Sequence, residues 1–208
     1  LVAQQVAGKA TRDTLFLSTF QVSSLPLVMI VSALASVLAV SFFSTALARR
    51  TPARVVPAAV GTGTVLLLLE WGLSLSWPAA AALAVYLHMA VFGHIVVSGF
   101  WSLVNERFDP YTARRAMARI GFGASLGGLA GGLLAWGASG LLPVTTMLAV
   151  MAGLNVAGLL AMSRLGTSAA GAAPAPPEAE GTGPLAGLRL TREVPYLRNL
   201  AVFVALGA

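Results

Sequence analysis

The positive charges of this chain gather in three places, and that distribution limits the fold more than any other feature. Eleven of the thirteen Lys and Arg residues form three clusters: Arg49, Arg50 and Arg54; Arg107, Arg114, Arg115 and Arg119; Arg164, Arg189, Arg192 and Arg198. The stretches between the clusters are nearly uncharged and long enough to cross a bilayer twice. Multi-spanning membrane proteins keep Lys and Arg in their cytoplasmic loops. The pattern therefore predicts a multi-pass membrane protein whose basic loops all face the cytoplasm.

The composition excludes several classes of protein. Hydrophobic residues make up 57% of the chain and charged residues only 10%, which is unusual for a soluble domain. The formal charge of +6 does not indicate nucleic-acid binding, because the basic residues separate apolar spans and do not line a solvated face. The absence of Cys excludes a disulfide framework, a thiol nucleophile and a cysteine metal site. One Lys against twelve Arg favours a bacterial source, and hence the bacterial inner membrane.

The apolar segments predict an all-α integral membrane fold. Six spans are expected, at residues 1–20, 25–47, 55–73, 79–103, 120–140 and 142–162. A turn at Asp109 and Pro110, followed by a short amphipathic helix from Thr112, is expected before the fifth span. Residues 166–190 are rich in Ala, Gly and Pro and predict a flexible cytoplasmic linker. Residues 1–165 then form the six-helix N-terminal half of a twelve-span, major-facilitator-like bundle, and 191–208 begin a truncated C-terminal half.

Charged groups in the first segment are the leading candidates for a substrate site, because ionisable side chains inside a membrane are costly. Gln5, Lys9, Arg12 and Asp13 share an arc of about 100° on a helix. Their net positive charge suits a small anionic substrate such as a phosphate or a carboxylate. Lys9 and Asp13 are four residues apart and can pair. Two alternatives stay open: Asp13 couples a proton or a cation, or the span ends near Gly8 and residues 9–13 form an external loop.

Other polar residues within the spans are weaker candidates. His88 and His94 lie near the middle of the fourth span, about 240° apart around the helix, so they cannot hold one metal ion together. Each is either a substrate contact or a packing residue. Asn155, central in the sixth span, is either a substrate contact or part of an interhelical hydrogen bond. Glu70 lies near the outer end of the third span, where it reaches the interface at little cost.

Small residues recur at every fourth position of the fifth span, at Gly123, Gly127 and Gly131. This spacing lets two helices approach closely, so we expect these glycines to pack against another helix. A phosphate-binding loop is excluded, because no Gly-Lys-Ser/Thr follows.

Four short motifs between the fourth and fifth spans resemble the same connection in the nucleotide (ATP/ADP) translocases of plastids and intracellular bacteria, and in related bacterial major-facilitator-like proteins. They are Phe100-Trp101, Asn105-Glu106, Ala113-Arg114-Arg115 and Gly121-Phe122-Gly123. The stretch from Gly8 to Asp13 is similar to the Lys and Arg-Asp region of that family's first span. The chain departs from the family's loop at residues 108–111. The resemblance covers residues 1–165 and implies a twelve-span transporter that exchanges nucleotides or phosphorylated anions without hydrolysing them.

The sequence thus predicts a secondary transporter of an organic or phosphorylated anion, with the lipid bilayer as its surroundings and no cofactor. Lys9 and Arg12 would bind the anion, helped by Gln5, Asp13, His88 and Asn155. A cytoplasmic gate is expected from loop residues: Asn105, Glu106, Asp109, Arg114, Arg115 and Arg119. The alternative is a non-transporting membrane anchor or sensor of the same fold, coupled to a fused soluble domain. An enzyme is not expected, because no Ser-His-Asp set, metal cluster or carboxylate pair is present in the spans.

Overall fold

The computed structural model of the protein describes residues 1–108, 110–166, 195 and 199, with the backbone alone for residues 107, 110–115 and 164–166. Its elements are α1 (Val2–Thr19), the short 3₁₀ helix η1 (Val22–Ser24), α2 (Leu25–Arg49), α3 (Pro52–Ser76), α4 (Pro78–Arg107), α5 (Pro110–Leu141) and α6 (Thr146–Gly166). Within the described residues the all-α prediction is confirmed. The predicted linker (166–190) and the start of a second half (191–208) lie outside them, apart from residues 166, 195 and 199.

Proline and short connections set the limits of the helices. Pro26, Pro52 and Pro78 stand in the first turns of α2, α3 and α4, where a missing N–H costs no hydrogen bond. Trp77 alone joins α3 to α4, so the predicted turn at 74–78 is shorter than expected. The amphipathic helix expected from Thr112 and the fifth span form one continuous helix, α5. The sixth span begins at Thr146 and not at 142, because Pro143 lies in the connection.

Five helices in the described part of the chain are long and apolar enough to cross a membrane. These spans are Val22–Arg49, Pro52–Ser76, Pro78–Glu106, Ala116–Leu141 and Thr146–Ser163. The sequence predicted six. α1 is not among the five, because its 18 residues include the charged Lys9, Arg12 and Asp13.

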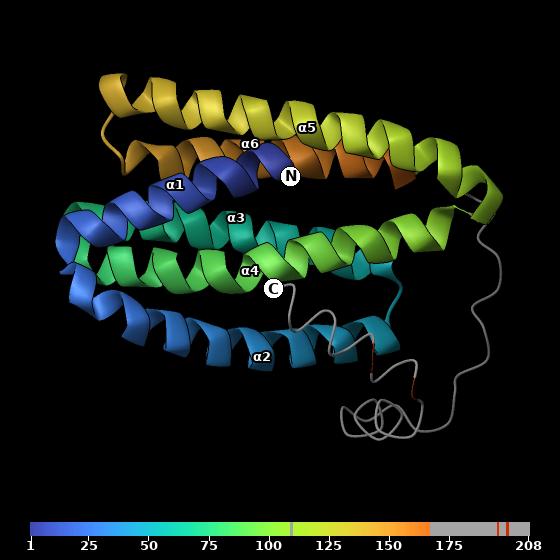
Figure 1. Ribbon diagram of the computed structural model, residues 1–208, viewed down its shortest axis with the longest axis horizontal. Coiled ribbons are helices and arrows are strands. Elements are labelled where there is room, and N and C mark those ends of the chain that lie inside the picture. Colours follow the sequence, from blue (N-terminus) through green and yellow to red (C-terminus); the bar gives the residue numbers. More distant parts are fainter. Residues whose placement is uncertain (109, 167–194, 196–198, 200–208) are drawn as a thin grey trace. The chain divides into compact units, whose positions relative to one another are not determined.

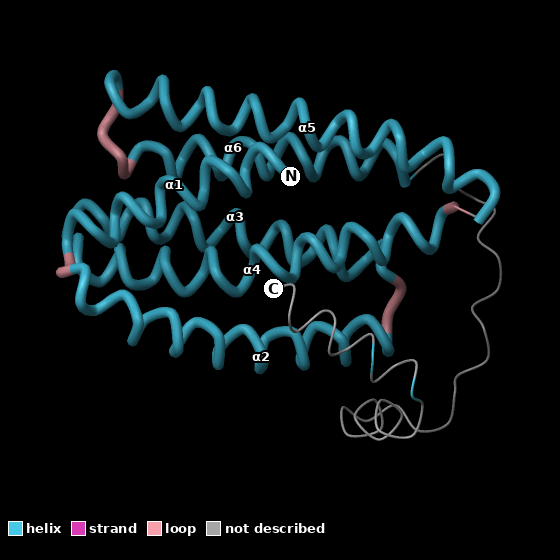
Figure 2. Tube along the Cα trace, viewed as in Figure 1, coloured by secondary structure: helices cyan, strands magenta, loops and turns pink. Residues whose placement is uncertain are grey.

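The helices run alternately up and down, as Figure 1 shows. α3 packs between α4 and α6, α2 packs on α4, and α1 packs against α4, α5 and α6. The connections α2–α3 and α4–α5 lie at one end of the bundle, and α1–α2, α3–α4 and α5–α6 lie at the other (Figure 2). Arg49, Arg50 and Arg54 therefore lie at the same end as the α4–α5 connection, as the charge pattern predicts.

The core of the bundle forms where α1, α3, α4 and α6 meet. Leu67, Val85, Leu148 and Met151 are completely buried there. By contrast, α2 and the outer side of α5 expose large apolar side chains along their lengths, including Phe42 and Trp136. An apolar outer surface of this kind is stable against lipid and not against water. The arrangement thus places a packed interior beneath an apolar outer surface, and α1 carries Lys9, Arg12 and Asp13 near its middle.

Candidate functional site

A narrow polar cavity lies in the interior, between α1, α3, α4 and α6. Its polar lining comes from Gln4 and Gln5 of α1, His88 of α4 and Asn155 of α6, and the glycines Gly63 and Gly93 open the space between the helices. Its free volume is about that of one water molecule. Gln4, His88 and Asn155 are each more than nine-tenths buried. The cavity therefore brings together three residues that the sequence nominated, Gln5, His88 and Asn155.

The two glutamines of α1 are held against α4. The Gln5 Nε2 group donates to the carbonyl oxygen of Gly93 over 3.5 Å, and the Gln4 Nε2 group lies 4.0 Å from the Met89 sulfur. A methyl group at Gly93 would lie 3.0 Å from the Gln5 Oε1 atom. Glycine at position 93 thus makes room for the Gln5 amide, and both contacts are long enough to be exchanged for a bound solute.

The strongest polar contact in the interior joins α3 to α4. The Nδ1 atom of His88 lies 3.0 Å from Oε2 of Glu70, and only 6% and 7% of these side chains are exposed. Phe92 packs edge-on against the imidazole, with ring centroids 4.8 Å apart. A methyl group at Gly63 would lie 3.5 Å from the His88 Nε2 atom. One ring nitrogen therefore meets the carboxylate while the other faces Gly63 and the cavity.

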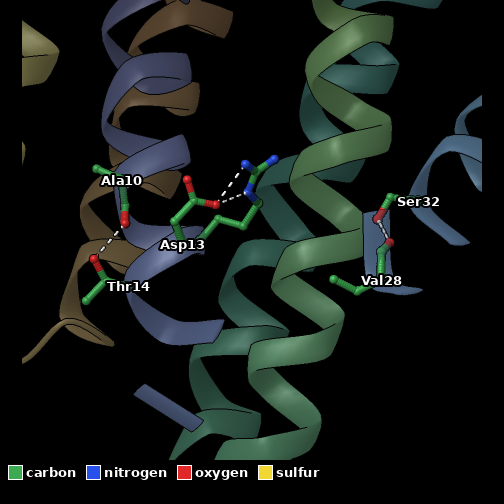
Figure 3. Close-up of polar contacts among 6 residues, drawn as sticks. Ala10, Asp13, Thr14, Val28 and Ser32 are labelled. Carbon is green, nitrogen blue, oxygen red and sulfur yellow. Dashed lines mark hydrogen bonds and ion pairs between the residues drawn. The ribbon is translucent and has the colours of Figure 1, made fainter. Parts of the chain in front are cut away.

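Arg12 and Asp13 form a second polar group, on α1. The Arg12 Nη2 and Asp13 Oδ1 atoms are 2.8 Å apart, and the Arg12 guanidinium lies 4.6 Å from the centre of the Tyr86 ring. Figure 3 shows the Asp13 ion pair beside the local Thr14–Ala10 and Ser32–Val28 hydrogen bonds. Asp13 thus pairs with Arg12 and not with Lys9, the pairing that the spacing allowed. Tyr86 holds the guanidinium next to the carboxylate, whereas Lys9 is exposed.

The cluster predicted on the first segment is divided. Residues 9–13 are helical and do not form a loop, and their position inside the membrane stays a prediction. Their shared arc does not bring them to one site, because Gln5 and Asp13 are separated by about 12 Å along the helix axis. Gln5 lines the cavity, Arg12 stacks on Tyr86, and Lys9 lines no part of the cavity.

The remaining candidates lie away from the cavity. His94 is exposed, and its Nδ1 atom contacts the carbonyl oxygen of Ala90. Asn105 and Glu106 are exposed in the last turn of α4, and Arg119 is exposed on α5. Asp109 lies outside the described residues, as do the side chains of Arg114 and Arg115. The predicted gate among these residues stays a prediction.

The glycines of α5 differ in what they face. Gly127 and Gly131 lie against Val2 and Ala3, so they set the distance between α1 and α5. Gly123 does not take part, because a methyl group there would meet no atom within 4 Å. Two of the three glycines that the spacing indicated therefore lie at the close contact between α1 and α5.

Sequence reasoning gave too little weight to Glu70 and did not single out Gln4. The signal for Glu70 was its position across the turn from His88. Glu70 lies seven residues before Trp77, the residue at the turn, and His88 lies eleven residues after Trp77. Two antiparallel helices joined by one residue place such positions at similar depths. Gln4 carried no separate signal, because a single glutamine beside another does not reveal which of them faces inward.

Comparison of the chain with protein-family models, curated proteins and solved structures finds no match. What the site binds must therefore follow from its own residues.

Replacing Arg12 with methionine should lower the free energy of unfolding by about 1 kcal/mol, because the cation–π contact with Tyr86 and a partly exposed ion pair are lost while the apolar stem is kept. Thermal unfolding in detergent measures the change. Lys9→Met is the matched control, since Lys9 is exposed, and it should change stability by less than about 0.5 kcal/mol. Equal effects of the two substitutions would show that Arg12 is not held by Tyr86.

Proposed function

We propose that the protein is a multi-pass membrane transporter that moves a small polar anion by alternating access. The observation that carries this proposal is the meeting of Gln4, His88 and Asn155 at one cavity inside an apolar helix bundle. Buried polar groups in membrane helices mark substrate pathways, because each costs free energy unless it is used or paired. Secondary transporters place such groups near the bilayer midplane, between helices that move.

The size of the cavity supports a moving bundle. Space for about one water molecule excludes any larger solute from this arrangement of the helices. Transport then requires α1 to separate from α4 and α6. The contacts that hold α1 at the cavity favour such a movement, because the Gln5 bond is long and Gln4 contacts a flexible methionine.

The anionic nature of the solute is supported by charge on α1. Lys9 and Arg12 against Asp13 leave this helix with a net charge of +1, next to a cavity whose amides donate hydrogen bonds. The cationic residues lie about 6 to 10 Å along α1 from Gln5. They are placed to attract an anion toward the cavity, and the amides are placed to hold it.

The narrower form of the proposal is exchange of ATP for ADP by two six-helix halves. It is supported by the resemblance of the α4–α5 connection and of residues 8–13 to the nucleotide translocases. It requires a wider opening than the cavity now has, because a nucleotide is far larger than a water molecule.

Uptake of labelled ATP, ADP or inorganic phosphate by the full-length protein in liposomes tests both forms. Gln5→Ala should lower uptake about tenfold, which corresponds to loss of about one hydrogen bond of roughly 1.4 kcal/mol. Gln21→Ala is the control, because Gln21 is exposed outside the helices, and it should leave uptake unchanged. In the same assay, unchanged exchange by Lys9→Ala would remove Lys9 from the mechanism. Failure of all three anions to move or to stabilise the protein would favour the membrane anchor over the transporter.

A further inference from the structure

We infer that Glu70 and His88 form a proton-binding site that opens into the cavity and couples movement of the anion to movement of a proton. The inference rests on the proposed function for the coupling, while proton binding itself can be measured without transport. It follows from the geometry of the pair, its net charge and its surroundings.

With Glu70 ionised, the geometry points to the nitrogen that takes the proton. An ionised carboxylate can only accept a hydrogen bond, so the His88 Nδ1–H group then donates to Glu70 Oε2 over 3.0 Å. Neutral imidazole carries one N–H, and its Nε2 atom therefore keeps a free lone pair. That atom faces Gly63 and the cavity, where Asn155 and Gln5 also lie. A proton arriving through the cavity meets Nε2 first.

The charge of the pair favours the protonated form in a closed bundle. With neutral His88 the pair carries a net charge of −1, and with a proton on Nε2 it carries none. A net charge buried among apolar helices is costly, whereas a hydrogen-bonded ion pair compensates for much of that cost. Imidazole is also the side chain that ordinarily changes charge between about pH 5 and 8. The closed arrangement should therefore hold one more proton than the open one.

The surroundings leave His88 as the partner of Glu70. The titratable groups on the helices packed around the pair include Lys9, Arg12 and Asp13 of α1, Arg54 of α3, and Tyr86, His94 and Glu106 of α4. Arg12 is held by Asp13 and Tyr86, Lys9 and His94 are exposed, and the described side chains of α6 include no titratable group. Among the described side chains, the ion-pair partner of Glu70 is His88. Arg49 and Arg54 lie at the other end of α2 and α3.

The coupling follows from what protonation does to Nε2. A proton from water on one side of the membrane binds Nε2 and turns it from an acceptor into a donor. The donor then binds an anion in the cavity together with the Gln5 and Asn155 amides. When the helices open to the other side, the anion leaves and the proton returns to water. One proton thus accompanies each anion: an O–H bond of a hydronium ion breaks as the Nε2–H bond forms, and the reverse occurs when the proton is released.

The first experiment measures proton binding directly on the full-length protein in detergent. Nitrogen-15 NMR of the His88 ring should show Nε2 gaining a proton as the pH is lowered, while Nδ1 stays protonated in its hydrogen bond to Glu70. A His88 ring whose Nε2 gains no proton before the protein unfolds would overturn the inference, whatever the protein transports.

The second experiment measures coupling in liposomes that contain a pH-sensitive dye. Addition of inorganic phosphate or ADP should acidify the lumen with the wild type and with His94→Gln. It should acidify the lumen at least tenfold more slowly with His88→Gln. Equal acidification by His88→Gln and His94→Gln would overturn the coupling. If the His88 ring gains a proton but the protein moves none of the anions, the proposed function and the coupling are both overturned. The proton-binding site would then stand on its own.

Discussion

Glu70→Leu is expected to lower the free energy of unfolding by about 3 kcal/mol, the largest single effect predicted for the interior. Leucine fills similar space but removes the partner of the His88 Nδ1 atom. Water cannot replace that partner, because only 6% of the His88 side chain is exposed. Removing one member of a buried, hydrogen-bonded ionic pair costs about 3 to 5 kcal/mol. Unfolding with increasing mole fraction of a denaturing detergent measures the change. Glu106→Leu is the control at an exposed position of α4 and should cost less than about 0.5 kcal/mol.

A double-mutant cycle separates the pair from its surroundings. Glu70→Leu combined with His88→Leu should cost less than Glu70→Leu alone, because replacing both members of a buried pair with apolar residues is often close to neutral. The coupling energy should be at least about 1.5 kcal/mol. Additive costs would mean that the two side chains contribute independently, and that the 3.0 Å contact does not stabilise the bundle.

Gly131→Leu is expected to separate α1 from α5 and to cost about 2 to 3 kcal/mol of stability. A β-carbon at this position would collide with the carbonyl oxygen of Ala3 and would lie 2.9 Å from its Cα atom. These are backbone atoms, so no rotation of a side chain relieves the contact. The midpoint of thermal unfolding should fall, and Gln5→Ala should then have little further effect on uptake because α1 no longer seats at the cavity.

Gly132→Leu is the matched control for this substitution. Gly132 is the next residue of the same helix, and a methyl group there meets no atom within 4 Å. Leucine is a better helix former than glycine by roughly 0.8 kcal/mol, so the control should be neutral or slightly stabilising. A similar loss for both variants would show that the spacing of α1 and α5 does not depend on a small residue at position 131.

The helices were predictable because their signals are local. Long apolar runs, a proline in the first turn and basic connections gave α2, α3 and α4 to within a few residues. The same local signals predicted that α1 is a membrane span, because the run interrupted by Lys9, Arg12 and Asp13 still has the length of a span. It also cut one helix in two before Ile120, where the polar start of α5 continues directly into its apolar part.

The site was predictable only in part, because it depends on how helices rotate against one another. Gln5, His88 and Asn155 were nominated for one substrate site on their chemistry alone, and the sequence did not show that they share a cavity. The pair of Glu70 and His88 depends on the rotation of α3 against α4, for which a spacing of eighteen residues gives no unique answer. Likewise, the spacing pointed to Lys9 as a partner for Asp13, whereas Arg12 pairs with it and lies on the Tyr86 ring, which is more than 70 residues away in sequence.

The enclosure of α1 has a consequence for how the protein is made. α1 is synthesised before α4, α5 and α6, yet these are the helices that cover it. Until α4 emerges from the ribosome, the Arg12 side chain lacks its contact with Tyr86 and faces either lipid or the insertion machinery. A charged side chain at mid-bilayer costs about 2.5 to 3.5 kcal/mol. We therefore expect α1 to be retained at the translocon or the membrane surface until α4 arrives.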